Sequence, residues 1–355
     1  MATTTSPPAT GPTSPADTRT ALVPLLFGFF PTQVLHAGAA LGVADHLAGG
    51  PLTTARLAEL TGTHEPSLAR LLRALACFGV LDEVEPGTFA HGPHAGGLLS
   101  EGPGSLRHLI ALFAGREVWA SWGELDETVR TGEPAWHRVT GTTAFEHMAA
   151  DPVYQAMFNR AMSEGTRNAA PGIVEAADLD RFSWLVDVGG GDGTLLAAAL
   201  AAHPALRGTV FDTADGMQAA PAVLAAAGLV DRADAVAGDF FSSVPAGADA
   251  YLLKSVIHDW DDERATAVLR NVRAAMPDGA TVLVVEPVVP PTPAASPDVL
   301  MMIMSDLNML VCTGGKERTE PEFRALLDGA GLRLRSITAV PGPTNFSVLE
   351  AGADG

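Results

Sequence analysis

The residues best suited to chemistry lie in the segment LLKSVIHDWDDE, residues 252–263. Lys254 and His258 are four residues apart at the carboxyl end of a short apolar run, where open α/β sheets bind their ligands. An imidazole accepts a proton near neutral pH, so His258 is a candidate general base. Two alternatives stay open here. His258 and Asp259 could merely begin the next helix, with Asp261 or Asp262 as its cap, or His and Asp side chains could ligate a divalent ion.

Two carboxylates could orient that imidazole. Glu286 ends the very apolar run ATVLVVEP, where a charge needs a partner. Glu317 lies in the glycine-rich segment CTGGKERTEPEF, ahead of a well-capped helix. Either one could hold one nitrogen of His258 and leave the other nitrogen free to act as the base.

A glycine-rich turn predicts a nucleotide-like ligand. In LVDVGGGDGTLLAAAL an apolar strand runs into Gly189 and its neighbours, and a helix follows. Glycine lets a ligand approach the backbone N–H groups closely. The Gly-x-Gly-x-Gly spacing differs from the Gly-x-Gly-x-x-Gly of dinucleotide sites, which argues against a nicotinamide oxidoreductase.

Two further acidic positions fit such a ligand. Asp212 ends the run GTVFD, about twenty residues after the glycines, where a carboxylate accepts hydrogen bonds from ribose hydroxyls. Asp239 and Phe240, in GDFF, could bind the amine and the ring of adenine. The alternatives are a capping aspartate at 212, and at 239–240 a turn aspartate followed by a core phenylalanine.

These residues need a sheet to position them. From Phe182 onward, short runs rich in β-branched residues alternate with helical stretches rich in Ala and Leu, which predicts a mainly parallel sheet covered on both faces. The predicted strands are WLVDV, GTVFD, DAVAG, ADAYLLKSV and ATVLVVEP. The last two runs, LRLRSITAV and NFSVLEA, are expected to pair as a hairpin at the sheet edge.

The N-terminal part reads differently. Residues 1–18 are rich in Pro, Thr and Ser and predict a disordered tail. Residues 21–44 carry no formal charge but are interrupted by Pro24 and Gly28, so we expect a buried helix, in a subunit interface, and no membrane span. Residues 53–92 follow a helix, helix, wing pattern, with Thr53 or Thr54 as a helix cap and a turn at Pro86 and Gly87. Residues 104–172 are expected to be mostly helical.

Composition limits the class of protein. The 355 residues include 22 basic and 41 acidic ones, a formal net charge of −19, which weighs against nucleic-acid binding. The winged-helix-like unit is therefore predicted to be a dimerisation module rather than part of a transcriptional regulator. The N-terminus shows no secretory signal, and the two cysteines, Cys77 and Cys312, are far apart and expected to be buried and unpaired. We expect a cytoplasmic protein.

In combination and order, the segments LVDVGGGDG, FD, GDFF, LLKSVIHDWDDE, LVVEPVVP and GGKERTEPEF resemble the plant caffeate-type and bacterial polyketide (carminomycin- and mitomycin-type) O-methyltransferases. The resemblance covers nearly the whole chain. It implies an α/β class I methyltransferase fold, Rossmann-like with a seven-stranded sheet, and a homodimer formed by N-terminal winged-helix-like domains. It departs from the family pattern at Asp192, where a small or hydroxyl residue is usual, and in FDTADG, which lacks a proline.

The resemblance also implies site residues. His258 corresponds to the general base, flanked by Glu286 and Glu317. The implied contacts to S-adenosyl-L-methionine are Gly189, Asp212, Asp239, Phe240 and Lys254. The positions expected to line the acceptor pocket are Met162, Asp259 and Asn308.

The predicted activity is transfer of a methyl group from S-adenosyl-L-methionine, leaving S-adenosyl-L-homocysteine, to a hydroxyl of a small aromatic secondary metabolite, without a metal. The alternative is a relative that uses the same cofactor for a non-methylating reaction such as hydroxylation. The predicted plan is a tail at 1–18, a dimerisation domain at 19–103, a helical connector at 104–172 that contributes to the acceptor pocket, and a catalytic domain at 173–355.

Overall fold

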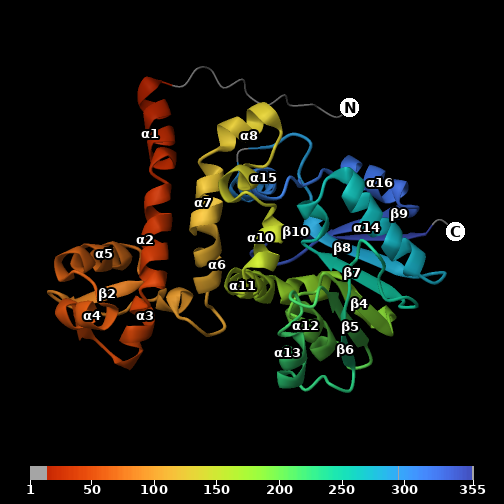
Figure 1. The fold of residues 1–355 in the computed structure, drawn as a ribbon, viewed down its shortest axis with the longest axis horizontal. Coiled ribbons are helices and arrows are strands. Elements are labelled where there is room, and N and C mark those ends of the chain that lie inside the picture. The colour runs from red at the N-terminus through yellow and green to blue at the C-terminus, as the bar shows by residue number, and fades with distance from the viewer. Residues whose placement is uncertain (1–13, 295, 354–355) are drawn as a thin grey trace, which may run out of the picture. The chain divides into compact units, whose positions relative to one another are not determined.

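A computed structural model describes residues 14–294 and 296–353 (Figure 1). The chain divides into two compact units, one ending at Gly102 and the other starting at Pro103. The N-terminal unit contains helices α1 (Pro15–Leu26), α2 (Phe29–Ala40), α3 (Val43–His46), α4 (Thr54–Thr61) and α5 (Glu65–Cys77). Its strands are β1 (Leu52–Thr53), β2 (Leu81–Glu85) and β3 (Thr88–His91), in the order β1-β3-β2.

The helix, helix, wing prediction is confirmed. The Thr53 side chain caps α4 by accepting a hydrogen bond from the Arg56 N–H at 3.2 Å, and Gly62 ends the helix in the left-handed conformation. Helix α5 buries Leu68, Leu72 and Leu75. Strands β2 and β3 pair around the turn at Pro86 and Gly87, and β1 adds a short third strand.

The first forty residues differ from expectation in two ways. Residues 15–18 are helical, not disordered, because Ser14 caps α1 and Pro15 occupies its first position; residues 1–13 lie outside the described part. Helix α1 buries none of its residues and α2 buries only Gly38 and Ala39, so the single chain does not bury this segment, and its burial in a subunit interface stays a prediction. Cys77 is also exposed, whereas Cys312 is buried as predicted.

The second unit begins with helices α6 (Arg107–Phe113), α7 (Arg116–Trp122), α8 (Leu125–Thr131), α9 (Ala135–Thr140), α10 (Ala144–Ala150) and α11 (Pro152–Ala176). Asp151 caps α11 by accepting the N–H groups of Val153 and Tyr154. Helix α11 passes through the predicted connector boundary at residue 172, and Pro171 inside it does not end it.

A seven-stranded sheet follows, as predicted, with strand order β6-β5-β4-β7-β8-β10-β9. The strands are β4 (Trp184–Val188), β5 (Arg207–Asp212), β6 (Ala233–Ala237), β7 (Ala250–Lys254), β8 (Thr281–Pro287), β9 (Leu332–Ala339) and β10 (Phe346–Ala353). The first five are parallel, while β10 pairs antiparallel with both β8 and β9. The hairpin therefore lies at the sheet edge with β9 outermost.

Helices cover both faces of this sheet (Figure 1). Helices α14 (Asp262–Ala275) and α16 (Glu320–Gly329) pack on one face, and α11, α12 (Thr194–Ala202) and α13 (Ala220–Ala226) pack on the other. Helix α15 (Pro297–Cys312) follows β8. Burial of these apolar faces is the main stabilising contribution, and it fixes the strand ends where the predicted site residues lie.

Candidate active site

The predicted site residues converge because parallel strands end at a common edge. Strands β4, β5, β7 and β8 are neighbours in register, so the segments after Val188, Asp212, Lys254 and Glu286 leave the same side of the sheet. This edge is where open α/β sheets bind ligands.

The glycine turn after β4 has no room for a side chain at its first two glycines. A Cβ added at Gly189, whose φ is +72°, would lie 2.6 Å from Cγ2 of Val256. At Gly190 it would lie 2.8 Å from the carboxyl group of Asp187, which burial makes less acidic, with a pKa of about 7. The turn therefore presents bare backbone, a shape that suits a nucleotide-like group.

Asp212 is anchored beside that turn. One of its carboxylate oxygens accepts the Gly191 N–H at 2.9 Å and the other accepts the Thr213 N–H at 2.6 Å. Burial raises the pKa of Asp212, and these hydrogen bonds oppose the rise. The Gly238 N–H donates to the carbonyl oxygen of Asp212 at 2.8 Å, which brings the end of β6 alongside.

The two residues that were predicted to bind adenine, Asp239 and Phe240, follow strand β6. Asp239 is exposed; it accepts hydrogen bonds from the Phe241 N–H at 2.8 Å and the Ser242 hydroxyl at 3.0 Å. Phe240 is half-buried, with its ring centroid 5.0 Å from that of Phe241. Asp239 therefore stabilises the turn, as the alternative to adenine binding proposed, and its side chain is also exposed to solvent.

Lys254 and Ser255 link the sheet edge to the histidine segment. The Lys254 ammonium donates to the Ser255 hydroxyl at 3.1 Å. Burial lowers the pKa of Lys254, and the nearby charges of Glu286, Asp187 and Asp259 oppose that effect. Ser255 has a φ of +54°, in the left-handed region that a non-glycine residue occupies at a cost of about 1–2 kcal/mol. Strain of this kind is common where a side chain must be aimed.

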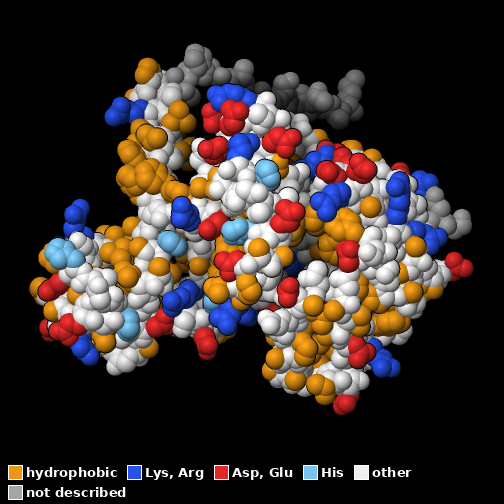
Figure 2. Space-filling model, viewed as in Figure 1, with side chains coloured by type: hydrophobic (Ala, Val, Ile, Leu, Met, Phe, Trp, Pro, Cys, Tyr) orange, Lys and Arg blue, Asp and Glu red, His pale blue; other side chains and the backbone are white. Residues whose placement is uncertain are grey.

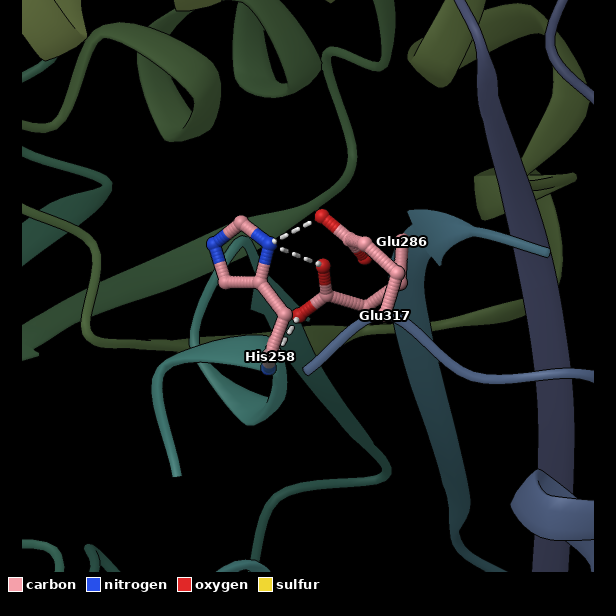
Figure 3. Close-up of side chains that lie close together, drawn as sticks. All are labelled: His258, Glu286 and Glu317. Carbon is pink, nitrogen blue, oxygen red and sulfur yellow. Dashed lines mark hydrogen bonds and ion pairs between the residues drawn. The ribbon is translucent and has the colours of Figure 1, made fainter. Parts of the chain in front are cut away.

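His258 faces two carboxylates with one nitrogen only (Figure 3). Its Nδ1 lies 2.9 Å from Oε1 of Glu317 and 3.4 Å from Oε2 of Glu286. Its Nε2 points away from both, and lies 3.9 Å from a carboxylate oxygen of Asp259. Nδ1 therefore carries the proton that Glu317 accepts, and Nε2 is left for a substrate.

The site's electrostatics favour a charged imidazole. Burial opposes the charge, but the attraction of Glu286 and Glu317 outweighs it and raises the pKa of His258 to about 10. Burial raises the pKa of Glu286 to about 7, against the pull of His258. Burial likewise raises the pKa of Asp259 to about 6.

Backbone contacts fix the turn that carries His258. Oε1 of Glu286 accepts the N–H groups of Val256 and Ile257, each at 3.0 Å. The fully buried Arg318 donates to the carbonyl oxygens of Ile257 at 3.1 Å and Trp260 at 2.8 Å. Both carboxylates that the sequence offered as alternatives are thus brought to the imidazole.

The structure decides one of the two remaining alternatives for this segment. His258 sits in a 3-10 turn (Ile257–Asp259) before α14, and Asp261 caps that helix by accepting the Arg264 N–H at 2.8 Å. The histidine is therefore not a helix-start residue. His258, Glu286 and Glu317 each offer a ligand atom within 4.8 Å of the others, close enough in geometry for a metal ion.

Of the predicted acceptor residues, Asp259 adjoins His258, Asn308 lies on α15, and Met162 packs against a cluster that includes residues of α15. Asn308 accepts the indole N–H of Trp122 at 3.0 Å through its side-chain oxygen. Met162 is half-buried against an apolar cluster that contains Trp136 and Cys312. With Asp259 beside Nε2, the surroundings combine flat apolar side chains with a few polar groups, as small-molecule sites do.

Sequence reasoning missed several residues. Ser305 touches the centre from a segment with no distinguishing pattern. Arg318 lies in the segment GGKERTEPEF, but nothing in that segment assigns the arginine a role. Asp192, noted as a departure from the family pattern, accepts the Ser163 hydroxyl at 2.6 Å and the Thr194 N–H at 3.0 Å. It therefore joins α11 to the start of α12.

Comparison with known proteins agrees with this geometry. The family model of the O-methyltransferase domain matches residues 122–333, and that of the O-methyltransferase dimerisation domain matches residues 23–101. The chain belongs to the O-methyltransferase family.

Particular relatives cover almost its whole length. O-demethylpuromycin-O-methyltransferase of Streptomyces alboniger is 39% identical over 93% of this chain and 88% of its own. The crystal structure of LaPhzM is 38% identical, with a TM-score of 0.89 over 95% of this chain and 99% of that one. That of NcsB1, an O-methyltransferase from neocarzinostatin biosynthesis in complex with S-adenosylmethionine and 2-hydroxy-5-methyl naphthoic acid, is 36% identical, with a TM-score of 0.75 over 91% and 95%.

Proposed function

We propose that this enzyme methylates a phenolic hydroxyl of a small aromatic secondary metabolite, with His258 as the general base and S-adenosyl-L-methionine as the methyl donor. The observation that carries the proposal is that Nδ1 of His258 is engaged by Glu317 at 2.9 Å while Nε2 points away from both carboxylates. The acceptors named for the relatives, a naphthoic acid among them, support an aromatic substrate.

His258 would take the proton from the acceptor hydroxyl at Nε2. A phenol has a pKa of about 10, and the attraction of Glu286 and Glu317 raises the pKa of His258 to about 10 against the effect of burial. Proton transfer from a phenol to the neutral imidazole, the minor form at neutral pH, is therefore nearly balanced. An aliphatic alcohol is far less acidic. Glu317 and Glu286 hold the imidazole and stabilise its positive charge while the acceptor oxygen reacts.

The residues at the strand ends fit the cofactor. When bound, S-adenosyl-L-methionine supplies an electrophilic methyl group on a cationic sulfur. The glycine turn at Gly189 would meet it with bare backbone, Asp212 would accept its ribose hydroxyls, and Asp239 and Phe240 would offer a carboxylate and a ring to adenine. Lys254, at the end of β7 and four residues before His258, is the remaining proposed cofactor contact.

The acceptor would lie among Met162, Asp259 and Asn308, beside Nε2. We propose that no metal takes part. One oxygen of each carboxylate already accepts at least two hydrogen bonds: Oε1 of Glu317 accepts from His258 and Ser305, and Oε1 of Glu286 accepts from the backbone of residues 256–257. Activity that persists in excess chelator is the expected result.

We further propose a cytoplasmic homodimer with no nucleic-acid or membrane partner. Large apolar side chains crowd the surface of α1 and α2, among them Leu26, Phe27 and Phe30 (Figure 2). The stretch from Pro15 to Ala40 is long and apolar enough to cross a membrane by length and composition. A second copy covering it is favoured because residues 23–101 match a dimerisation domain. Leu26→Glu with Phe30→Glu should yield monomers in light scattering.

The decisive test of the chemistry is His258→Asn, assayed with a panel of phenols, aliphatic alcohols and aromatic amines and with labelled S-adenosyl-L-methionine. The general-base role predicts a drop in kcat of about 10²–10⁴-fold with the accepted phenol. Calorimetry should find the cofactor affinity nearly unchanged. Near wild-type kcat in this variant would show that His258 is not the base.

A further inference from the structure

One carboxylate oxygen at the centre accepts two hydrogen bonds. Oε1 of Glu317 accepts Nδ1–H of His258 at 2.9 Å and the Ser305 hydroxyl at 2.7 Å. The Glu317 side chain is fully buried, and its Oε2 has no hydrogen-bond partner among the described residues. His258 and Ser305 therefore share the charge of a single oxygen.

The two carboxylates are held differently. Glu286 is fixed by backbone N–H groups of residues 256–257, which no side-chain replacement removes. Glu317 is held from α15: its own N–H donates to a carboxylate oxygen of Asp306 at 2.9 Å, and Ser305 supplies the hydroxyl. Of these two contacts from α15, Ser305 is the one that reaches the Glu317 carboxylate, and a single substitution can delete it.

We propose that Ser305 is a positioning residue for the base: its hydroxyl holds the Glu317 carboxylate against Nδ1 of His258 and moderates the pull of that carboxylate on the imidazole. The inference rests on the proposed function of His258. A hydrogen bond to a carboxylate is stronger when no nearby cation offsets the carboxylate's negative charge. The Ser305 hydroxyl therefore stabilises the Glu317 carboxylate more when His258 is neutral than when His258 is protonated. Ser305 therefore favours the state in which His258 is neutral and able to accept a proton.

Other charges face this pair and stay in place when Ser305 is changed. Glu286 and Asp259 face His258, and Lys254 faces both of those carboxylates. Asp306 faces Glu317 from α15, with Lys316 and Glu322 farther out. A change seen on removing the Ser305 hydroxyl can thus be assigned to that hydroxyl.

The test compares Ser305→Ala and Ser305→Thr with Ser296→Ala in the full-length enzyme. Ser296 caps the same helix by accepting the Val299 N–H at 3.4 Å and does not touch Glu317, so its loss controls for damage to α15. The readout is the titration of the His258 ring by NMR in labelled protein, assigned with His258→Asn. It needs neither cofactor nor acceptor, so it can fail while the methyltransferase proposal stands.

Ser305→Ala should raise the titration midpoint of His258 by about one pH unit, the size expected for one hydrogen bond to a charged group. The pH profile of kcat/KM for an accepted phenol should move the same way, with about a tenfold loss at neutral pH. Ser305→Thr should keep the wild-type titration midpoint and the wild-type pH profile, and Ser296→Ala should lower only the melting temperature.

If Ser305→Ala does not fold, Ser305→Cys, whose thiol is a weaker donor, should give a smaller rise in the His258 titration midpoint. A His258 titration that coincides with wild type in Ser305→Ala, or in Ser305→Cys if Ser305→Ala does not fold, overturns the proposal.

Discussion

The backbone of Gly315 packs directly against the carbonyl group of His258. A Cβ at Gly315 would overlap that oxygen and the backbone of Asp259, while the next residue, Lys316, donates its N–H to the same oxygen at 2.9 Å. This contact lets the loop that carries Glu317 lie flat against the turn that carries His258. The glycine therefore sets the distance between the imidazole and its carboxylate.

Gly315→Ala should separate these two segments. We expect a loss of stability of about 1–3 kcal/mol, typical of overpacking, and a fall in kcat of at least tenfold because Nδ1 loses its partner. Gly165→Ala is the control, since a Cβ there meets nothing within 4 Å. Thermal melts and initial rates decide; an active, stable Gly315→Ala would mean that the loop does not orient the base.

Asp212→Ala should weaken cofactor binding about 10–100-fold. The substitution removes the carboxylate that accepts the Gly191 N–H and that we propose accepts the ribose hydroxyls. Calorimetric titration with S-adenosyl-L-homocysteine measures this effect without turnover. The exposed Asp215 nearby provides the control, as Asp215→Ala. Equal affinity in both variants would contradict the ribose assignment.

Arg318→Met should destabilise the protein by about 3 kcal/mol or more. The fully buried guanidinium donates to the carbonyl oxygens of Ile257 and Trp260 and pairs with Asp262 at 2.9 Å, and methionine removes all of these interactions. Arg324→Met breaks an exposed ion pair with Glu320 at 2.7 Å. Such pairs contribute ~0–1 kcal/mol to the free energy of unfolding, so this variant should lose less than 1 kcal/mol. Denaturant unfolding of both variants separates the two outcomes; similar midpoints would show that the buried arginine is not structurally critical.

Stability should decrease as the pH rises above neutral. The attraction of Glu286 and Glu317, against the effect of burial, raises the pKa of His258 from 6.5 to about 10, so between these values the folded protein binds more protons than the unfolded chain. The contribution of His258 to the free energy of unfolding is therefore fully present below pH 6.5 and is lost as the pH rises to about 10. Burial of Glu286, whose pKa rises from 4.5 to about 7, acts with the same sign at lower pH.

The check is the melting temperature from pH 6 to 10. His258→Asn should flatten the curve above pH 7, whereas His64→Asn, at an exposed histidine of the N-terminal unit, should leave its slope unchanged. Parallel curves for wild type and His258→Asn would contradict the raised pKa. Methyl transfer should rise over the same range, because the base works when it is unprotonated.

The sequence alone determined the order of elements and much of the site. Strand, glycine turn and helix each have a local pattern, so the sheet, the glycine loop and the strand-end residues Asp212 and His258 were predictable. Patterns of this kind arise within a few residues and need no knowledge of distant segments.

Only the tertiary structure decided which distant groups meet. The sequence offered Glu286 or Glu317 as the partner of His258; the fold brings both to Nδ1, one from a central strand and one from a loop 59 residues away along the chain. Ser305 and Arg318 had no distinctive spacing, and the exposure of α1 was hidden by its apolar composition. Contacts between remote residues depend on how helices and strands pack, and packing is set by the whole core rather than by any local pattern.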